Sequence, residues 1–406
     1  MLKLIMKQLW SRRKNNAWLF VELVVVTVVS WIVLDPLIVS LYDKNVPLGY
    51  DVERLCVINF MDFDCREEEK REAAELFKTK LMQSGDVENV CLLTGHYPDN
   101  QQNGGSWSSI SEDVTYSIFN IMEREPTLHM YGVRVVSGSL TLKDIENGNL
   151  PEHGIVMTAS LARRLFGTEQ AAGRKISSYT VAAVVSDIRM RSSSVNADVM
   201  IERKSGFRSR FRLLVRLKLG VVPQRFSEET YEWAVKELRT DKLHVQNVIA
   251  YEDAAEKLNG YNGFSNTVRT NTAFAVFFLF NLCIGVVCTF WLQTKQRYEE
   301  VGIMRSFGAT GRRIVMQIMM EGFLLTTVAV MVGCLAYLQY VRNESLYLGR
   351  DLINPRMDWV GDFGIHFLVV SFIVYLIMLI VVGIGIYIPA HGISRVAPVD
   401  ALRSDE

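Results

Sequence analysis

Hydrophobic residues in this chain are gathered into four long runs, and polar segments of very different length separate them. Each run approaches or exceeds the roughly 20 residues that a helix needs to cross the hydrocarbon of a membrane. Buried helices of a soluble protein are the alternative, but four runs of this length with basic flanks are not typical of such proteins. We predict transmembrane helices at residues 17–42, 271–294, 314–341 and 364–390.

Basic residues at the ends of the runs predict how the chain crosses the membrane. They lie before the first run, between the second and third, and after the fourth: Lys3, Lys7, Arg12, Arg13, Lys14, Lys295, Arg297, Arg305, Arg312, Arg313, Arg395 and Arg403. Cytoplasmic segments carry such an excess. Both termini and the loop at 295–313 are therefore expected inside, with residues 43–270 and the loop at 342–363 outside. The first run is too long for a signal peptide, and no small-residue cleavage site follows it.

The segment before the first run has its own pattern. In residues 1–16, an apolar helical face carries Leu2, Ile5, Met6, Leu9 and Trp10, while Lys3 and Lys7 lie off it. This pattern predicts a cytoplasmic amphipathic helix that lies on membrane lipid, although a frayed basic terminus stays open as an alternative. Residues 391–406 are expected to form a cytoplasmic tail.

Residues 43–270 alternate between strand-like and helix-like patterns, which indicates an α+β domain. The predicted fold class is thus an α-helical membrane protein, with four transmembrane helices and an α+β extracytoplasmic domain. Strands are expected at 52–60, 87–93, 130–136, 155–158, 180–188, 211–218 and 244–250, and helices at 66–83, 160–166 and 227–238. The strand at 211–218 alternates and reads as half-buried. Residues 101–111, rich in Gly, Ser and Gln, read as a mobile loop.

Composition narrows the functional classes. The formal net charge is zero and no large basic patch is present outside the membrane flanks, so a nucleic-acid partner is not expected. Cys56, Cys65 and Cys91 fall in the extracytoplasmic domain, and three is an odd number, so a disulfide framework is not indicated. A single bridge of Cys56 with Cys65 or Cys91 stays open.

The sequence lacks the common motifs of enzyme chemistry. The sequence has no G-x-x-x-x-G-K-[ST] phosphate loop, no H-E-x-x-H, no C-x-x-C pair and no G-x-S-x-G. Its six histidines are scattered without the spacing of metal ligands. We therefore predict a non-catalytic subunit with no catalytic, cofactor or metal residues, in which any ATP is bound by another chain.

A few polar side chains fall within the predicted membrane helices. They are Glu22, Asp35, Asn281 and Glu321. Charges in such helices usually face protein or water. One interpretation is an ion or substrate path, and the other is hydrogen bonding between helices or snorkelling near the interface. The second is favoured because these residues are few and lie near the helix ends.

The loop at 295–313 is amphipathic. Val301, Ile303, Met304 and Phe307 cover one helical arc, and Glu299, Gly302, Arg305 and Ser306 cover the other. Such a helix can place its apolar face in a groove of a partner, or it can rest on lipid. Gly308 and Gly311 are expected to end it.

Three segments resemble a known family. EVGIMRSFGATGRRI at 300–314 resembles the loop between the second and third membrane helices of FtsX-like ABC transporter permeases, and Glu321-Gly322 fits the helix that follows. IVMTASLARRLFGTEQAAGRKI and then YTVAAVVSDIR, within 155–189, resemble the MacB-like periplasmic core domain. The tail PAHGISRVAPVDALRSDE resembles the family's C-terminus. Residues 95–130 match no part of the family.

The resemblance implies partners. In the family, the loop contains a coupling helix that docks on an ATP-binding subunit. The residues expected to couple here are Glu300, Val301, Gly302, Ile303, Met304, Arg305, Phe307 and Gly308. MacB carries a fused ATPase, whereas this chain starts with the amphipathic segment, so a separate ABC-type ATPase that binds ATP and Mg is implied. A second permease, identical or paralogous, completes the complex.

The implied function is that of an ABC transporter permease subunit in the inner (cytoplasmic) membrane. It would couple ATP hydrolysis in the partner to movement of the extracytoplasmic domain, which is mechanotransmission, for efflux or extraction of a substrate. A membrane-fusion protein and an outer-membrane channel would join it in efflux. The alternative is a membrane regulator or receptor that controls a cell-wall enzyme or a sensor kinase. A membrane enzyme is a third class, favoured only by the topology.

Overall fold

The computed structural model describes residues 13–100, 107–111, 114–204, 206, 211–261, 263–295, 297–344 and 356–394. Residues 1–12 of the predicted amphipathic segment 1–16 therefore lie outside the described residues, as do 101–106, 345–355 and the tail from 395, whereas residues 13–16 belong to the first long helix. The chain divides into two compact units. We call them the helical unit and the α+β unit, and the chain passes between them at Leu41 to Tyr42 and at Asn266 to Thr267.

Four long helices build the helical unit. They are α2 (Arg13–Asn45), α9 (Phe264–Lys295), α11 (Gly311–Glu344) and α12 (Phe363–Ser394). Each contains a stretch long and apolar enough to cross a membrane, with mean hydropathy between 2.0 and 3.1. The predicted fold class is confirmed. The helices extend a few residues past the predicted hydrophobic runs, because helical hydrogen bonding continues into their polar flanks.

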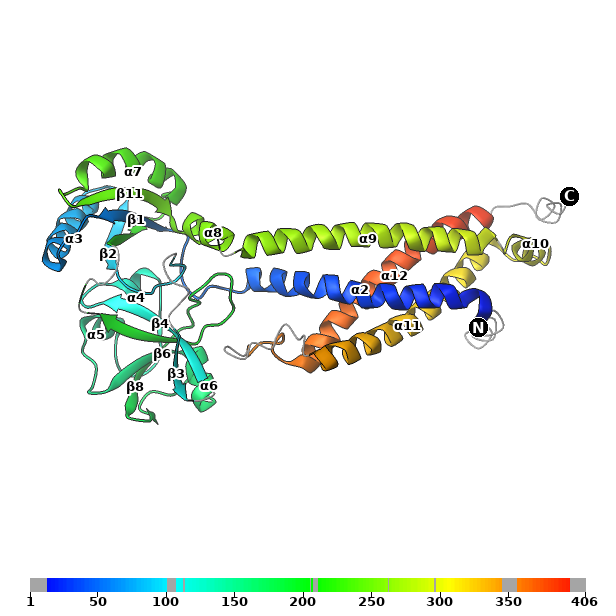
Figure 1. The fold of residues 1–406 in the computed structure, drawn as a ribbon, viewed down its shortest axis with the longest axis horizontal. Coiled ribbons are helices and arrows are strands. Elements are labelled where there is room, and N and C mark those ends of the chain that lie inside the picture. Colours follow the sequence, from blue (N-terminus) through cyan, green and yellow to red (C-terminus); the bar gives the residue numbers. More distant parts are fainter. Residues whose placement is uncertain are drawn as a thin grey trace. The chain divides into compact units, whose positions relative to one another are not determined.

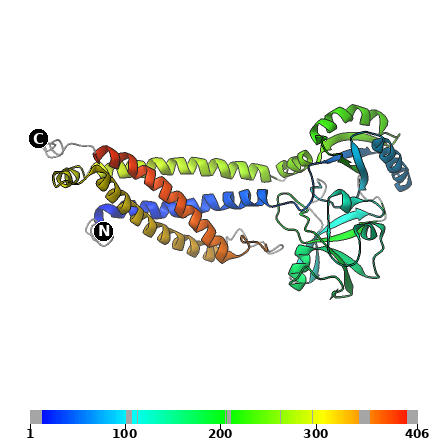
Figure 2. The same cartoon turned by 180° about the vertical axis from the view of Figure 1, so that it is seen from behind.

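The inward faces of these helices share one apolar core, and small residues let the helices approach closely. A Cβ atom added at Gly322 of α11 would lie 2.0 Å from Cδ1 of Ile386 on α12. One added at Gly333 would lie 2.7 Å from Cβ of Thr27 on α2. Close contact at small residues is typical of helices packed within a membrane. Figures 1 and 2 show α11 and α12 lying side by side.

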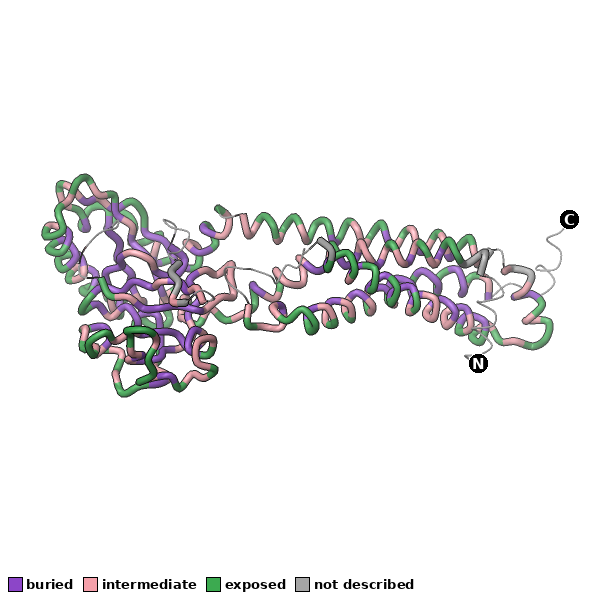
Figure 3. Tube along the Cα trace, turned by 60° about the horizontal axis from the view of Figure 1, so that its bottom comes forward, coloured by how far each residue is buried: buried purple, intermediate pink, exposed green. Residues whose placement is uncertain are grey.

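Exposed positions recur along the same helices (Figure 3), and many of them are large hydrophobic residues. Examples are Phe277 and Phe280 on α9, Leu335 on α11 and Leu368 on α12. An apolar surface of this kind is unfavourable in water and matches the hydrocarbon of a bilayer. The burial pattern therefore supports the membrane assignment independently of the length of the helices.

The first sheet of the α+β unit is antiparallel. Its order is β11 (Leu243–Ala250), β1 (Leu55–Asp62), β10 (Arg212–Leu217) and β2 (Val87–Leu93). Helices α3 (Glu67–Met82) and α7 (Pro223–Glu237) cover one face and share a core with it. On α3 the predicted inward residues Ala73, Ala74, Phe77 and Leu81 are all buried, as their helical spacing requires.

The second sheet is mixed. Its strand order is β3 (Trp107–Ser111), β4 (Val114–Met122), β9 (Val199–Lys204), β6 (Gly154–Thr158), β8 (Tyr179–Val185) and β5 (Val135–Ser137). A short strand, β7 (Lys175–Ile176), also pairs with β8. The pairs β4–β9 and β6–β8 are parallel. Around it lie α4 (Thr127–Met130), α5 (Leu142–Asn147) and α6 (Ala159–Phe166). Helix α8 (Tyr251–Tyr261) follows β11. A shared core joins the free face of the first sheet to this second layer.

Several local predictions were wrong. Residues 107–111, expected in a mobile loop, form strand β3, because pairing with β4 satisfies their backbone groups. The expected strand at 130–136 begins instead as the end of α4, and only β5 is extended there. Strand β10 is not half-buried, because Arg212 and Leu214 on its second face are covered as well.

Cysteines of the α+β unit are free thiols. Cys56 and Cys91 lie on opposite faces of the first sheet, each in a different core. Burial raises the pKa of the Cys56 thiol to about 12 and that of Cys91 well above its usual range. Cys65 is half-buried at the start of α3. The structure therefore separates Cys56 from Cys91 by the sheet and forms no disulfide among these three cysteines.

Helix α3 also provides an acid-sensitive contact. The Glu69 carboxylate accepts a hydrogen bond from the Arg66 amide at 2.8 Å and pairs with Lys242 Nζ at 2.8 Å. The Lys242 ammonium and this amide hold the pKa of Glu69 down at about 2, below its ordinary 4.5. A depressed carboxyl pKa contributes stability above pH 4.5 and loses it as the pH falls toward 2.

We therefore expect the melting temperature of Glu69→Gln to fall less between pH 6 and pH 3 than that of the wild type. The difference should be about 1–2 °C, which is small because the pair is exposed to solvent. Thermal unfolding of the full chain across this pH range measures it. Glu72→Gln, an exposed change on the same helix, serves as the control. An acid response of Glu69→Gln equal to that of the wild type would contradict the assignment.

Candidate functional site

The predicted coupling segment forms a short helix, α10 (Tyr298–Ser306), between α9 and α11. It lies at the end of the helical unit where α2 begins and α12 ends (Figure 1). Packing confirms this placement, because α10 contacts α12 and because a Cβ atom added at Gly311 would lie 3.2 Å from the carbonyl oxygen of Ser394. The segment is therefore an ordered part of the bundle.

A glycine ends this helix. Gly308 has φ +86°, its amide donates to the carbonyl of Arg305 at 2.9 Å, and the Ala309 amide donates to that of Met304 at 3.0 Å. This pair of bonds is a Schellman motif, in which a left-handed residue satisfies the last helical carbonyls. Gly311 has a different role from the predicted one. It begins α11 and permits the close approach to Ser394.

Burial divides the predicted apolar arc of α10 into two parts. Val301 is only 4% exposed and belongs to the core of the helical unit. Ile303 is 47% exposed and Phe307, just past the last helical residue, is 88% exposed. Among the other predicted residues, Gly302 is buried, Glu300, Met304 and Arg305 are half-buried, and Gly308 is exposed. The structure thus turns one edge of the arc inward and leaves the other uncovered.

An ion pair fixes the start of α10 to the next membrane helix. Arg297, at the N-cap position, pairs with Glu321 of α11, and both side chains are largely buried. From the sequence, Glu321 was predicted to be an intramembrane carboxylate at a family-like position and Arg297 to be an orientation signal, and their contact was not predicted. A buried pair has no periodic signature, since its partners lie in different elements 24 residues apart.

Polar side chains also join the other membrane helices. His366 Nε2 of α12 lies 2.6 Å from Asp35 Oδ1 of α2, and both are buried. Thr289 of α9 donates to Glu22 of α2 at 3.2 Å. These contacts support the interpretation that such residues bind helix to helix. Asn281 differs, since it donates to the carbonyl of Phe277 in its own helix.

In the α+β unit, one buried arginine holds the end of α2. Arg189 is 2% exposed and its guanidinium donates to four backbone carbonyls. The acceptors are Val46 at 2.5 Å, Asp43 at 3.2 Å, Ser192 at 2.7 Å and Ser194 at 2.7 Å. The last carbonyls of a helix lack intrahelical partners. Arg189 therefore attaches the segment 189–194, which we call the junction loop, to the last turn of α2.

The junction loop also contacts the segment that leads to α9. Asn259 of α8 donates to Ser192 Oγ at 2.9 Å. Ser192 in turn donates through both its amide and its hydroxyl to Asp99 Oδ1, at 2.9 Å each. One short loop thus connects the chain that leaves the first membrane helix with the chain that approaches the second. Sequence patterns did not indicate it.

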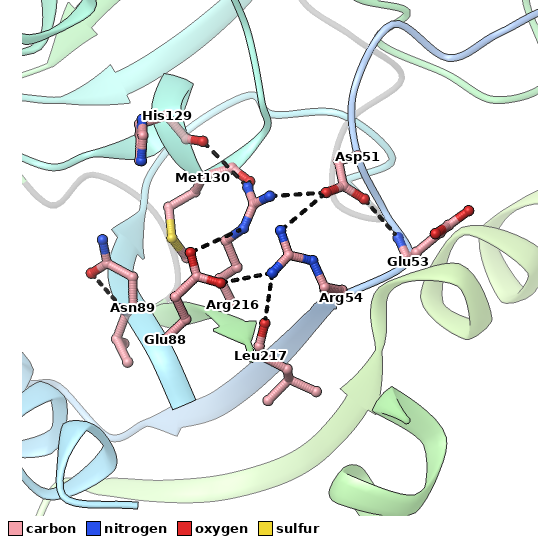
Figure 4. A network of polar contacts seen from close by, with 10 residues as sticks. Asp51, Glu53, Arg54, Glu88, Asn89, His129, Met130, Arg216 and Leu217 are labelled. Atoms are coloured by element: carbon pink, nitrogen blue, oxygen red, sulfur yellow. Dashed lines mark hydrogen bonds and ion pairs between the residues drawn. The ribbon is translucent and has the colours of Figure 1, made fainter. Parts of the chain in front are cut away.

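A second network joins the two layers of the α+β unit (Figure 4). Arg216 of β10 donates to the Met130 carbonyl at 2.7 Å and to Asp51 at 2.9 Å. Glu88 of β2 lies close by and accepts from Arg54 at 2.7 Å. The network holds α4 and the chain before β1 on the first sheet, which makes the unit one body rather than two loosely linked sheets.

Comparison with known proteins identifies the part of the helical unit that follows α2 and the α+β unit in the chain. Residues 272–391 match the family model described as FtsX-like permease C-terminal. This part of the chain is an FtsX-like permease domain. The FtsX-like domain begins within α9, contains all of α10 and α11, and ends within α12. The resemblance seen at residues 300–314 and at Glu321-Gly322 is thereby confirmed.

Two solved structures are similar over about half of the chain. One is a domain of a protein described as a permease from Porphyromonas gingivalis (16% identity, 50% of this chain and 93% of that chain, TM-score 0.29). The other is the periplasmic region of MacB from Actinobacillus actinomycetemcomitans (13% identity, 52% and 93%, TM-score 0.27). No curated protein matches the chain. The MacB-like character of residues 155–189 stays a prediction.

Proposed function

We propose that the chain is the membrane subunit of an ABC-type transporter, and that α10 transmits movement of a separate ATPase subunit to the α+β unit. One observation carries the proposal. Within the FtsX-like domain, α10 is fixed to the bundle by Val301 and by the Arg297–Glu321 pair, while Ile303 and Phe307 stay uncovered. A large apolar side chain that is 88% exposed next to a rigidly held helix is typical of a docking surface.

Force on α10 has a defined path into the membrane. Movement of Phe307 would pull on α11 through the Arg297–Glu321 pair, and α11 packs along α12. The Trp31 ring of α2 stacks on Tyr337 of α11 at 4.3 Å between centroids, so α2 would follow. Packed helices of this kind shift as units, because close-packed interiors transmit strain.

The path would continue outside the membrane. Helix α2 runs without interruption into the α+β unit, where Arg189 holds its last turn. The partner supplies ATP and Mg, and a second permease, identical or paralogous, would pair with this chain. The proposal places α10 on the cytoplasmic side of the membrane and the α+β unit on the outer side. The same coupling would serve whether the substrate is transported or a partner protein is acted on.

Capture of the ATPase tests this function. We expect Phe307→Asp to abolish co-purification of an ATP-binding subunit with the tagged, detergent-solubilised chain, because a charge cannot enter an apolar groove without a large desolvation cost. Ser306→Asp adds the same charge to an adjacent exposed residue and should leave the complex intact. Mass spectrometry of the captured proteins measures both. Equal recovery of the ATPase with Phe307→Asp and with wild type would overturn the docking role.

A further inference from the structure

A small pocket lies in the α+β unit, on the face of the first sheet opposite to α3 and α7. Its floor comes from β1, β10 and β11, and one wall comes from α8. The cavity volume is about 70 Å³, which is room for a functional group with a few carbon atoms rather than for a large ligand. The lining residues that matter here are Asn59, Arg212, Asn247, Lys257 and Asp99.

Arg212 is the unusual member of this lining, because its buried charge is hydrogen-bonded to neutral groups rather than to a carboxylate. It is 7% exposed, and its Nη1 donates to the hydroxyl of Tyr97 and, at 2.9 Å, to Asn100 Oδ1. Both partners are neutral. Among the residues that the structure describes, the hydrogen bonds of this guanidinium go to these two neutral groups, and Asp99 is the carboxylate of the same lining. A buried charge with neutral partners is costly, and a bound anion would remove that cost.

Asp99, in the same pocket, does not supply that anion. Its Oδ1 accepts from the amide and hydroxyl of Ser192, and its Oδ2 accepts from the Tyr50 hydroxyl at 2.7 Å. Burial, together with the Asp99 charge, raises the pKa of the Tyr50 hydroxyl well above its usual range, so Tyr50 remains a donor. Three donors therefore hydrogen-bond to this carboxylate, and two of them belong to the junction loop.

A second cation and a polar wall complete the pocket. Lys257 is exposed on α8 at its edge. Asn59 and Asn247 are hydrogen-bonded to each other at 2.7 Å and present amide groups, while Val57, Ile249 and Ala254 provide apolar contact. Guanidinium groups bind carboxylates through two parallel hydrogen bonds.

We propose that this pocket binds the carboxylate of a small ligand that carries a short aliphatic group, with Arg212 as the principal contact and Lys257 as a second. Because Asp99 lines the pocket and accepts hydrogen bonds from Ser192, an occupied pocket would lie next to the group that holds the junction loop. The inference does not rest on the proposed coupling to an ATPase.

Butyrate and butyramide provide a matched pair of probes, because they share shape and differ in charge. Saturation-transfer difference NMR with the full chain in nanodiscs should show saturable binding of butyrate, and butyramide should bind at least about tenfold more weakly. Butyramide is also the control for partition of the probes into lipid. Equal signals from the two probes, or no saturable butyrate signal at about 10 mM, would refute the proposal.

Variants locate the site. Arg212→Gln keeps a donor for Tyr97 and Asn100 but removes the charge, and should weaken butyrate about tenfold or more. Lys257→Gln, a change on the surface, should weaken butyrate binding by a few-fold. This variant provides the test if Arg212→Gln does not fold. Lys236→Gln, an exposed cation on α7 beyond the other face of the sheet, should leave butyrate binding unchanged. Butyrate affinity unchanged in both Arg212→Gln and Lys257→Gln would show that the pocket is not the site.

Discussion

Replacing Arg189 with methionine should lower the free energy of unfolding of the α+β unit by about 3 kcal/mol or more, because a single buried guanidinium satisfies four backbone carbonyls. Methionine fills similar space but donates nothing, so the carbonyls of Asp43, Val46, Ser192 and Ser194 lose their partner together. The last turn of α2 and the junction loop should then open locally well before the sheets do.

Hydrogen–deuterium exchange of the full chain measures this effect. Arg189→Met should increase exchange at residues 42–47 and 189–196, and more weakly in β1 and β10. Arg191→Met is the matched control, since Arg191 belongs to the same loop and no hydrogen bond of its side chain occurs among the described residues. If the two variants exchanged alike, the Arg189 contacts would not be what holds this end of α2.

Replacing Glu321 with glutamine should release α10 from the helical unit while its exposed face stays intact. Removing one partner of a buried ion pair costs about 3–5 kcal/mol, because the remaining charge is left uncompensated. Arg297 would be that charge. On the proposed function, the ATPase subunit should still co-purify, since Ile303 and Phe307 are unchanged, but ATP hydrolysis should no longer respond to the α+β unit.

A double variant separates this cause from simple damage. Arg297→Gln together with Glu321→Gln removes both charges and should recover much of the stability that the single change loses. Hydrogen exchange of residues 298–306 reports the release of α10. Glu321→Gln with wild-type exchange in α10 would show that the ion pair does not hold this helix, and equal stability of the single and double variants would argue against charge pairing.

The sequence predicted the membrane helices well because length and hydropathy are properties of each segment alone. It also predicted the buried face of α3, whose residues follow a helical period. It failed for β10, since alternation cannot tell whether a second layer covers the polar face, and Arg212 is buried by that layer. The signal for β3 was hidden by its Gly- and Ser-rich surroundings, and only pairing with β4 decides its conformation.

The candidate site was predicted in position but not in detail. The segment around Phe307 could be found from its charge, its short length and its flanking membrane helices. Periodicity placed Val301 and Phe307 on one face, whereas packing against the bundle buries the first and leaves the second exposed. The contacts of Arg189 could not be predicted at all, because its acceptors are backbone carbonyls, some of them more than 140 residues away.

The three cysteines of the α+β unit have a practical consequence. Cys56 and Cys91 are enclosed in separate cores, and their raised pKa values keep them as unreactive thiols at neutral pH. Cys65 alone among them is partly accessible. Once Cys283 and the exposed Cys288 of the helical unit are replaced, a maleimide-linked fluorophore should therefore attach at a single position just before α3. The α+β unit thus offers its own attachment point for optical measurement of how this unit moves.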